Sequence, residues 1–177
     1  MPGEPAEYPR EFDDRLILPD LRRLHVRALH RCEEEPIREL DSHLSVQSRY
    51  LRFLSPLPQL PDSLVRLLAC VDYRRTLALV VEGETDAREI VGLGSFGAVD
   101  DGAAEVALLV RDDWQRQRVG LELARRVLAA AESRGFHRFV VHMHTDNVPI
   151  RRLLHHVGRV VSAKVSGGVS ELAFVRG

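Results

Sequence analysis

The chain has 177 residues, of which 45% are hydrophobic and 29% are charged. This length and apolar content suffice for one globular domain with a core and give no reason to expect two. The formal net charge is -1 at pH 7, so no basic field indicates nucleic-acid binding. The two cysteines, Cys32 and Cys70, lack C-x-x-C spacing, and the sequence therefore predicts neither a disulfide framework nor a zinc site.

The N-terminal segment differs in composition from the rest of the chain. Residues 1–17 are rich in proline and acidic side chains and show no apolar periodicity before Leu16, which predicts a mobile tail followed by a single domain over residues 18–177. No apolar run resembles a signal peptide or approaches the roughly 18 residues of a membrane span. We therefore expect a cytoplasmic protein that has no membrane partner.

The first half of the domain changes its apolar period several times. Alternating apolar residues over Arg23–Leu29 predict a half-buried strand. Helical spacing within Cys32–Leu54 predicts two short helices, which the following prolines stop. A further short helix is expected over Asp62–Cys70, with Asp62 as its N-cap.

The second half begins as a meander of strands and continues with alternating helices and strands. The overall order β-αα-βββ-α-β-α-ββ predicts an α/β (α+β) fold with a mixed, mostly antiparallel central sheet and helices on both faces. An Asp or Asn at positions 146 and 147 is suited to capping the last helix. The expected elements are strands at Thr76–Val81, Glu89–Phe96, Glu105–Val110, His137–His142, Val160–Val165 and Glu171–Val175, and helices at Val119–Arg134 and from Asp146 or Asn147 to His156.

Two motifs suggest other functions but lack the necessary context. Gly92-x-Gly94-x-x-Gly97 matches a dinucleotide-binding pattern, yet a turn and a strand follow it where that site needs a helix. The histidines at positions 142, 144, 155 and 156 have the wrong spacing for a zinc helix and no completing carboxylate or thiol. We predict no dinucleotide fold and no metal.

The segment from Ala104 to Gly120, AEVALLVRDDWQRQRVG, carries a more specific signal. A strand, a short polar loop and a helix follow one another, and successive loop amides with the positive end of the helix suit a pyrophosphate. The segment resembles the central motif of the GNAT acyltransferases, whose loop reads Gln/Arg-x-x-Gly-x-Gly/Ala, with Gln115 and Gly120 at its first and last positions. Arg118 stands where that family usually has its first glycine.

Two further segments agree with this resemblance. Asn147 occupies the place where the family often has an Asn that bonds the pantetheine arm, although Leu154 replaces the usual Tyr acid. Upstream, the stretch from Ser48 to Phe53, SRYLRF, is similar to one in the bacterial protein lysine acetyltransferase branch (Pat-type). The resemblance implies acetyl-CoA as cosubstrate, held by Leu108, Leu109, Val110, Gln115, Arg116, Gln117, Arg118, Val119, Gly120 and Asn147.

Glu105 is the residue that the resemblance assigns as general base. A lysine amine has a pKa near roughly 10.4, so a base must take its proton near neutral pH. Apolar neighbours on the strand predict partial desolvation of the Glu105 carboxylate, which favours proton uptake. Strand amides near Leu109 or Val110 are candidates to stabilise the oxyanion. The alternative role of Glu105 is an edge-strand salt bridge, and His142 or His144 would then be the better base.

The predicted function is therefore transfer of an acetyl group from acetyl-CoA to a primary amine, with a protein lysine as the expected acceptor. Two alternatives stay open. The changes at Arg118 and Leu154 are also compatible with a non-catalytic coenzyme A sensor, and an acidic cluster at positions 33–35 and 41 could attract a small cationic amine. The sequence leaves the acyl chain length and the oligomeric state open.

Overall fold

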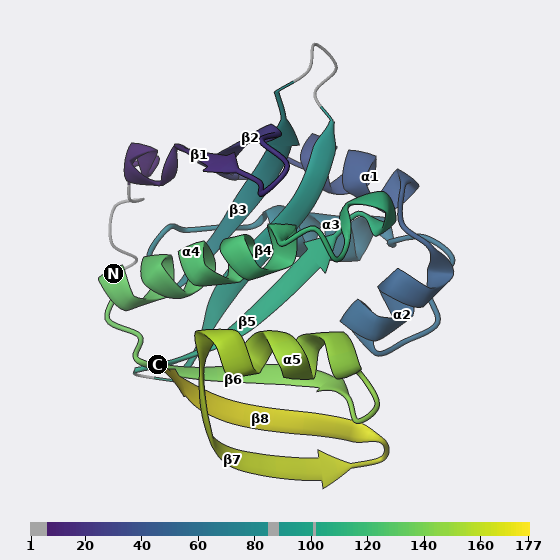
Figure 1. The fold of residues 1–177 in the computed structure, drawn as a ribbon, viewed down its shortest axis with the longest axis vertical. Coiled ribbons are helices and arrows are strands. Elements are labelled where there is room, and N and C mark those ends of the chain that lie inside the picture. Colours follow the sequence, from purple (N-terminus) through teal and green to yellow (C-terminus); the bar gives the residue numbers. More distant parts are fainter. Residues whose placement is uncertain (1–6, 85–88, 101) are drawn as a thin grey trace.

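A computed structural model of the protein describes residues 7–84, 89–100 and 102–177, and eight strands within these ranges form one sheet (Figure 1). The sheet order is β1-β2-β3-β4-β5-β6-β8-β7. Neighbouring strands are antiparallel except β5 and β6, which are parallel. The strands are β1 (Asp14–Ile17), β2 (Arg23–Ala28), β3 (Thr76–Gly83), β4 (Ile90–Asp100), β5 (Ala103–Val110), β6 (Arg138–His144), β7 (Gly158–Ser166) and β8 (Val169–Arg176).

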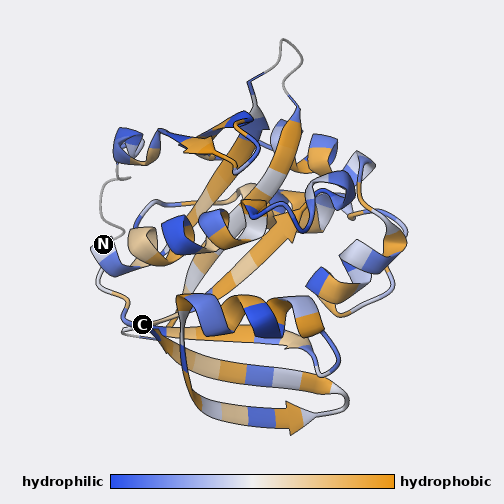
Figure 2. Ribbon diagram, in the orientation of Figure 1, coloured by the Kyte–Doolittle hydropathy of each residue, from blue (hydrophilic) through white to orange (hydrophobic). Residues whose placement is uncertain are grey.

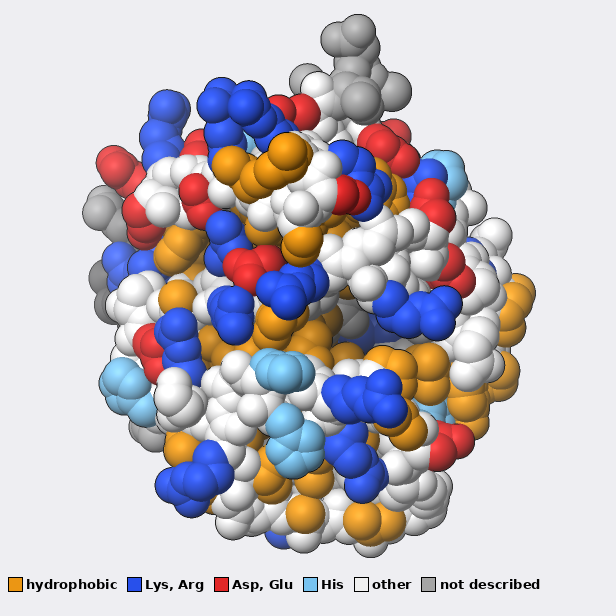
Figure 3. All heavy atoms as spheres, in the orientation of Figure 1, with side chains coloured by type: hydrophobic (Ala, Val, Ile, Leu, Met, Phe, Trp, Pro, Cys, Tyr) orange, Lys and Arg blue, Asp and Glu red, His pale blue; other side chains and the backbone are white. Residues whose placement is uncertain are grey.

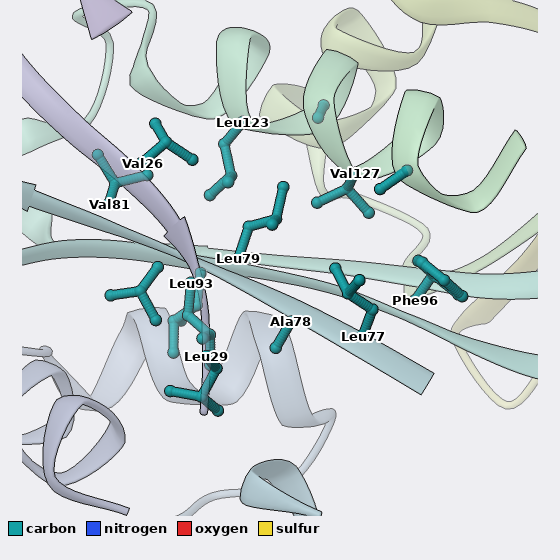
Figure 4. Packing of buried hydrophobic residues seen from close by; sticks show 14 of the residues in the cluster. Val26, Leu29, Leu77, Ala78, Leu79, Val81, Leu93, Phe96, Leu123 and Val127 are labelled. Atoms are coloured by element: carbon teal, nitrogen blue, oxygen red, sulfur yellow. The ribbon is translucent and has the colours of Figure 1, made fainter. Parts of the chain in front are cut away.

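Helices cover both faces of this sheet, as predicted. The α-helices are α1 (Glu35–Ser42), α2 (Val46–Phe53), α3 (Asp62–Ala69), α4 (Val119–Ser133) and α5 (Val148–Val157), and two 3-10 turns are η1 (Arg10–Phe12) and η2 (Asp112–Trp114). Helix α4 packs against β3, β4 and β5, whereas α1 contacts β4 from the other side. Figure 4 shows the strands passing between these helix layers.

The core explains why the central strands are continuous apolar runs. Hydrophobic residues are concentrated along the central strands (Figure 2). In β3, the residues from Leu77 to Val81 are all buried, because a helix covers each face. Leu123 and Val127 of α4 point toward this sheet in Figure 4.

The Gly92-x-Gly94-x-x-Gly97 pattern has a packing role. A Cβ atom on Gly94 would lie 2.8 Å from side-chain atoms of both Leu123 and Val127, so glycine lets α4 approach β4 closely. After β4 the chain enters β5 and not a helix. The expectation that this motif is no dinucleotide site agrees with that geometry.

Two details differ from the sequence prediction. Residues 14–17, which the sequence places in the predicted mobile tail, form β1, where Leu16 pairs with Leu24 and is 3% exposed. A four-residue strand with one buried side chain offers too little periodicity to be recognised. Helix α3 is capped at Pro61, so that Asp62 lies in its first turn and pairs with Arg38 at 2.8 Å. Residues 1–6 of the predicted tail lie outside the described residues.

The resulting order is ββ-ααα-βββ-α-β-α-ββ, which has one strand more than predicted, and its three short helices before β3 are the ones expected individually, although the predicted order counted two. The additional strand is β1, and all three short helices before β3 form separately. In the described part of the chain, no helix is long and apolar enough to cross a membrane. The prediction of a mixed, mostly antiparallel sheet with helices on both faces is confirmed.

Candidate acyl-transfer site

The sheet opens between β5 and β6. These two strands pair only where Ala103–Glu105 faces Arg138–Val140. Beyond this point β5 continues to Val110 and β6 to His144, but no further pairs join them. The edge of β5 after Glu105 therefore faces an opening in the middle of the sheet.

An apolar cavity lies on the α4 and α5 side of this opening. It is lined by residues of β5, β6, α4 and α5, including Val106, Leu108, Val141 and Leu153. In the space-filling view, this face is hollowed, with hydrophobic side chains inside and Lys, Arg and His side chains around the rim (Figure 3). Leu154, the residue at the usual Tyr position, lines the cavity and is 4% exposed. The cavity gives the opening a small apolar wall on the α4 and α5 side.

The loop that follows β5 leads to the N-terminus of α4. Arg116 has φ 58° and Arg118 has φ 71°, and α4 begins at Val119. The first N–H groups of a helix have no partner within the helix, and they carry the positive end of its dipole. The backbone at Arg118 thus has the left-handed conformation that glycine favours, with an exposed arginine side chain. The conformation suits anion binding at this helix end.

The two glutamines of the loop make contacts within the protein. The Gln115 side-chain amide donates to the carbonyl oxygen of Val110 at 3.0 Å and to the Ser48 hydroxyl at 3.1 Å. The Gln117 side-chain amide donates to the carbonyl oxygen of Asp113 at 2.7 Å. These side chains fix the loop, so any role in ligand binding falls to their backbone amides.

The two predicted oxyanion donors, the N–H groups of Leu109 and Val110, point in opposite directions from β5. The N–H of Arg111 donates to the carbonyl of Val91 at 2.9 Å. Because hydrogen bonding alternates along an antiparallel pair, Leu109 also faces β4, whereas Leu108 and Val110 face the opening. The carbonyl of Val110, which accepts from Gln115, points the same way. Val110 is therefore the better placed of the two, and Leu109 is directed away.

Glu105 lies at the point where β5 and β6 separate. Its Oε1 is 3.3 Å from Nδ1 of His142, and Nε2 of His142 is 3.2 Å from Oε2 of Glu171 on β8. The Glu105 side chain is 44% exposed, so it is less enclosed than its apolar strand neighbours predicted. The two carboxylates flank opposite nitrogens of one ring and so do not converge as metal ligands; the described residues contain no group of three or more His, Cys, Asp or Glu that could hold a metal ion.

Helix α2 brings the Arg52 guanidinium and the Tyr50 ring to the side of the opening on which Glu105 lies. Burial lowers the pKa of the Arg52 guanidinium, and the negative charge of Glu105 acts in the opposite direction. The Tyr50 ring stacks on His144 with centroids 4.3 Å apart. By contrast, Arg49 is buried and pairs with Asp41 at 2.6 Å. The SRYLRF segment thus has one structural arginine and two residues beside the opening.

Asn147 serves as the N-cap of α5. Its Oδ1 accepts a hydrogen bond from the backbone N–H of Ile150 at 3.3 Å, and the residue is 5% exposed. Of the two capping candidates in the sequence, Asn147 is the one used. Its contact with a pantetheine arm stays a prediction.

Sequence reasoning missed the partners of Glu105. From the sequence, His142 is a candidate only as a metal ligand or a substitute base, and neither Glu171 nor Arg52 is singled out for a role beside Glu105. The alternation of β6 does place His142 and His144 on one face. The cross-strand pairing of His142 with Glu171 depends on the return of β8 beside β6, for which the sequence has no local signal.

A family model described as "Acetyltransferase (GNAT) domain" matches residues 15–160, and the chain belongs to this family. An acetyltransferase of Pseudomonas aeruginosa is 30% identical over 122 residues, which span 67% of this chain and 65% of that relative. The matched segment is thus slightly less than two thirds of the relative's length. The family predicted from the AEVALLVRDDWQRQRVG segment is confirmed.

Solved structures show the same fold. The GNAT domain of S. lividans PAT has a TM-score of 0.85 and 24% identity, and the match covers 96% of this chain and 99% of that domain. A cAMP-binding acyltransferase from Mycobacterium smegmatis has a TM-score of 0.61 and 21% identity, with coverage of 93% and 48%. A ribosomal L7/L12 alpha-N-protein acetyltransferase, RimL, in complex with coenzyme A has a TM-score of 0.64 and 16% identity, with coverage of 86% and 94%.

Proposed function

We propose that this chain is an N-acetyltransferase that moves an acetyl group from acetyl-CoA directly to a primary amine, with a protein lysine as acceptor and Glu105 as general base. The observation that carries the proposal is the separation of β5 and β6 at Glu105. It puts a carboxylate at one end of an opening whose other end is the α4 N-terminus. Membership of the GNAT family supports the reaction class.

The residues of the opening fit acetyl-CoA. The left-handed loop backbone and the first amides of α4 suit its pyrophosphate, and the unpaired β5 edge, beside apolar residues of α4 and α5, offers backbone groups to the amides of its arm. Acetyl-CoA supplies the acetyl group as a thioester. The β5 edge at Leu108 and Val110 lines the opening that leads from the loop toward Glu105.

The role of each residue in the reaction follows from where its side chain or backbone N–H points. Glu105 takes the proton that the amine loses as it attacks the thioester carbonyl carbon. Val110 lies five residues beyond Glu105, about 16 Å along the strand, so the Leu108 N–H, which also faces the opening and lies nearer to Glu105, donates to the oxygen that gains negative charge. Side chains of β5 alternate, so Glu105 lies on the face opposite Leu108 and the α4 cavity. We infer that the amine approaches from the α2 side, opposite the cavity.

Leu154 favours a second candidate, a coenzyme A sensor that does not catalyse transfer. A buried leucine at this place cannot protonate a leaving thiolate. A coenzyme A thiol leaves without much help, so the enzyme remains the better proposal. The two functions differ in turnover and not in binding.

We expect coenzyme A to bind and to stabilise the fold. A ligand at 100 times its Kd adds about 2.7 kcal/mol to the free energy of unfolding, so Tm should rise clearly. Isothermal calorimetry and thermal melts with coenzyme A check this. No heat and no shift of Tm at millimolar ligand would contradict both the enzyme and the sensor.

The acceptor is tested with the purified protein, acetyl-CoA and a cell lysate. Mass spectrometry should find the acetyl group on lysine side chains of proteins, and a parallel reaction with Glu105→Gln sets the background. Acetylation confined to small amines would refute the protein acceptor and keep the enzyme. Binding of coenzyme A without any acetylated product would favour the sensor.

A further inference from the structure

The loop between β5 and α4 holds an unfavourable backbone conformation without glycine. Arg116 and Arg118 both have positive φ, at 58° and 71°. Side chains other than glycine are strained in this region, and such residues persist only where the surrounding structure holds them. The loop therefore needs contacts that keep its amides directed outward at the helix end.

One such contact comes from the turn between β1 and β2, far away in the sequence. The Arg22 guanidinium lies over the Trp114 ring, 4.4 Å from its centroid, and its Nη2 donates to Oε1 of Gln117. Gln117 in turn donates to the carbonyl of Asp113. Arg22 thus joins η2 to the residue between the two left-handed arginines.

Arg22 is itself held in place. Asp20 accepts from the Arg22 Nε at 2.7 Å and from the Arg22 backbone N–H at 3.1 Å. The pair is about half exposed, with 43% and 52% of the two side chains accessible, so its own contribution to stability is small. Its effect is on geometry, because both contacts fix the direction of the guanidinium. The planar fork can then face Gln117 and Trp114 at once.

We propose that Arg22 is a positioning residue that keeps the 115–118 loop in its anion-binding conformation and so compensates for the glycine missing at position 118. The inference rests on the proposed function, in which this loop binds the pyrophosphate. Without Arg22, the strained backbone at Arg118 is free to relax and the loop amides turn away from the ligand. Glycine at position 118 would adopt positive φ without strain, and the contact would then matter less.

A double-mutant cycle with Arg22→Ala and Arg118→Gly tests this coupling. Calorimetry with coenzyme A gives Kd for the wild type, both single variants and the double variant, and melts verify that each is folded. We expect Arg22→Ala to raise Kd about tenfold in the wild-type background, and to change it by less than about twofold in the Arg118→Gly background. At saturating acetyl-CoA, kcat should be unchanged. Arg23→Ala, at the exposed neighbouring position, is the matched control and should leave Kd unchanged.

Arg22→Lys separates positioning from charge. Lysine keeps the positive charge but lacks the planar fork, so its Kd should resemble that of Arg22→Ala. Full affinity in Arg22→Lys, or an equal loss in both backgrounds, would mean direct attraction of the phosphates and would overturn the proposal. An unchanged Kd in Arg22→Ala would overturn it as well. If the wild type itself does not bind coenzyme A, the proposed function fails too, whereas wild-type binding with an unaffected Arg22→Ala refutes only this inference.

Discussion

Replacing Glu105 with glutamine should lower turnover by roughly 10²- to 10⁴-fold near neutral pH, because the amide keeps the size of the side chain but cannot take a proton. The affinity for coenzyme A should stay almost unchanged, since the phosphate site lies at the other end of the opening. Steady-state kinetics with an established amine acceptor and calorimetry with coenzyme A measure the two effects separately. The low-pH limb of the wild-type pH profile, which reports protonation of the base, should vanish in the variant.

Glu171→Gln is the matched comparison for this variant. It makes the same change on the other carboxylate of His142, 3.2 Å from the ring and on the far side from Glu105. Its loss of turnover should be much smaller, because Glu171 does not border the opening between β5 and β6. Joint loss of stability and affinity in Glu105→Gln would indicate the salt-bridge role. Full activity of Glu105→Gln across pH would contradict the assignment and leave His142, 3.3 Å away, as the better base.

The elements around the candidate site that the sequence predicted correctly lie within one continuous segment. Strand β5, the loop and α4 follow one another without interruption, and the strand begins and the helix ends within two residues of the predicted bounds. The apolar residues recur every two residues in the strand and about every 3.6 residues in the helix, and the spacing changes at the polar loop between them. Gln115 and Gly120 in this segment, together with Asn147 and the SRYLRF stretch, carried the resemblance to the family.

The missed parts of the site depend on contacts between distant segments. Arg22 and Gln117 are 95 residues apart, and His142 and Glu171 are 29 residues apart. Such pairs follow from strand order and register, which a local apolar period does not determine. The conformation of Arg118 is a related case. The sequence shows that an arginine stands where the family usually has a glycine, but it does not show that the backbone keeps the positive φ that glycine favours. The loop is held by Arg22, Gln115 and Ser48, none of which flanks Arg118 in the chain.

Replacing Gly120 with valine should weaken coenzyme A binding by more than about tenfold, because the added side chain enters the opening. A Cβ atom at this position would lie 3.6 Å from a methyl of Val110 and 3.7 Å from a methyl of Leu153, that is, between β5 and α5. One such atom makes ordinary contacts, so Gly120→Ala is the matched control. It should bind nearly normally and should not lower the free energy of unfolding, since alanine is the better helix former.

The methyl groups that valine adds extend from a Cβ that already contacts Val110 and Leu153, and in the proposed function they stand in the way of the ligand. Calorimetry on the wild type and both variants gives the three Kd values, and chemical denaturation gives their stabilities. A stable Gly120→Val protein with wild-type affinity would show that the ligand does not pass this point, and the pyrophosphate site would have to lie away from the α4 N-terminus. Equal weakening by alanine and valine would instead mean that the backbone of Gly120 itself must approach the phosphate, closer than any Cβ permits.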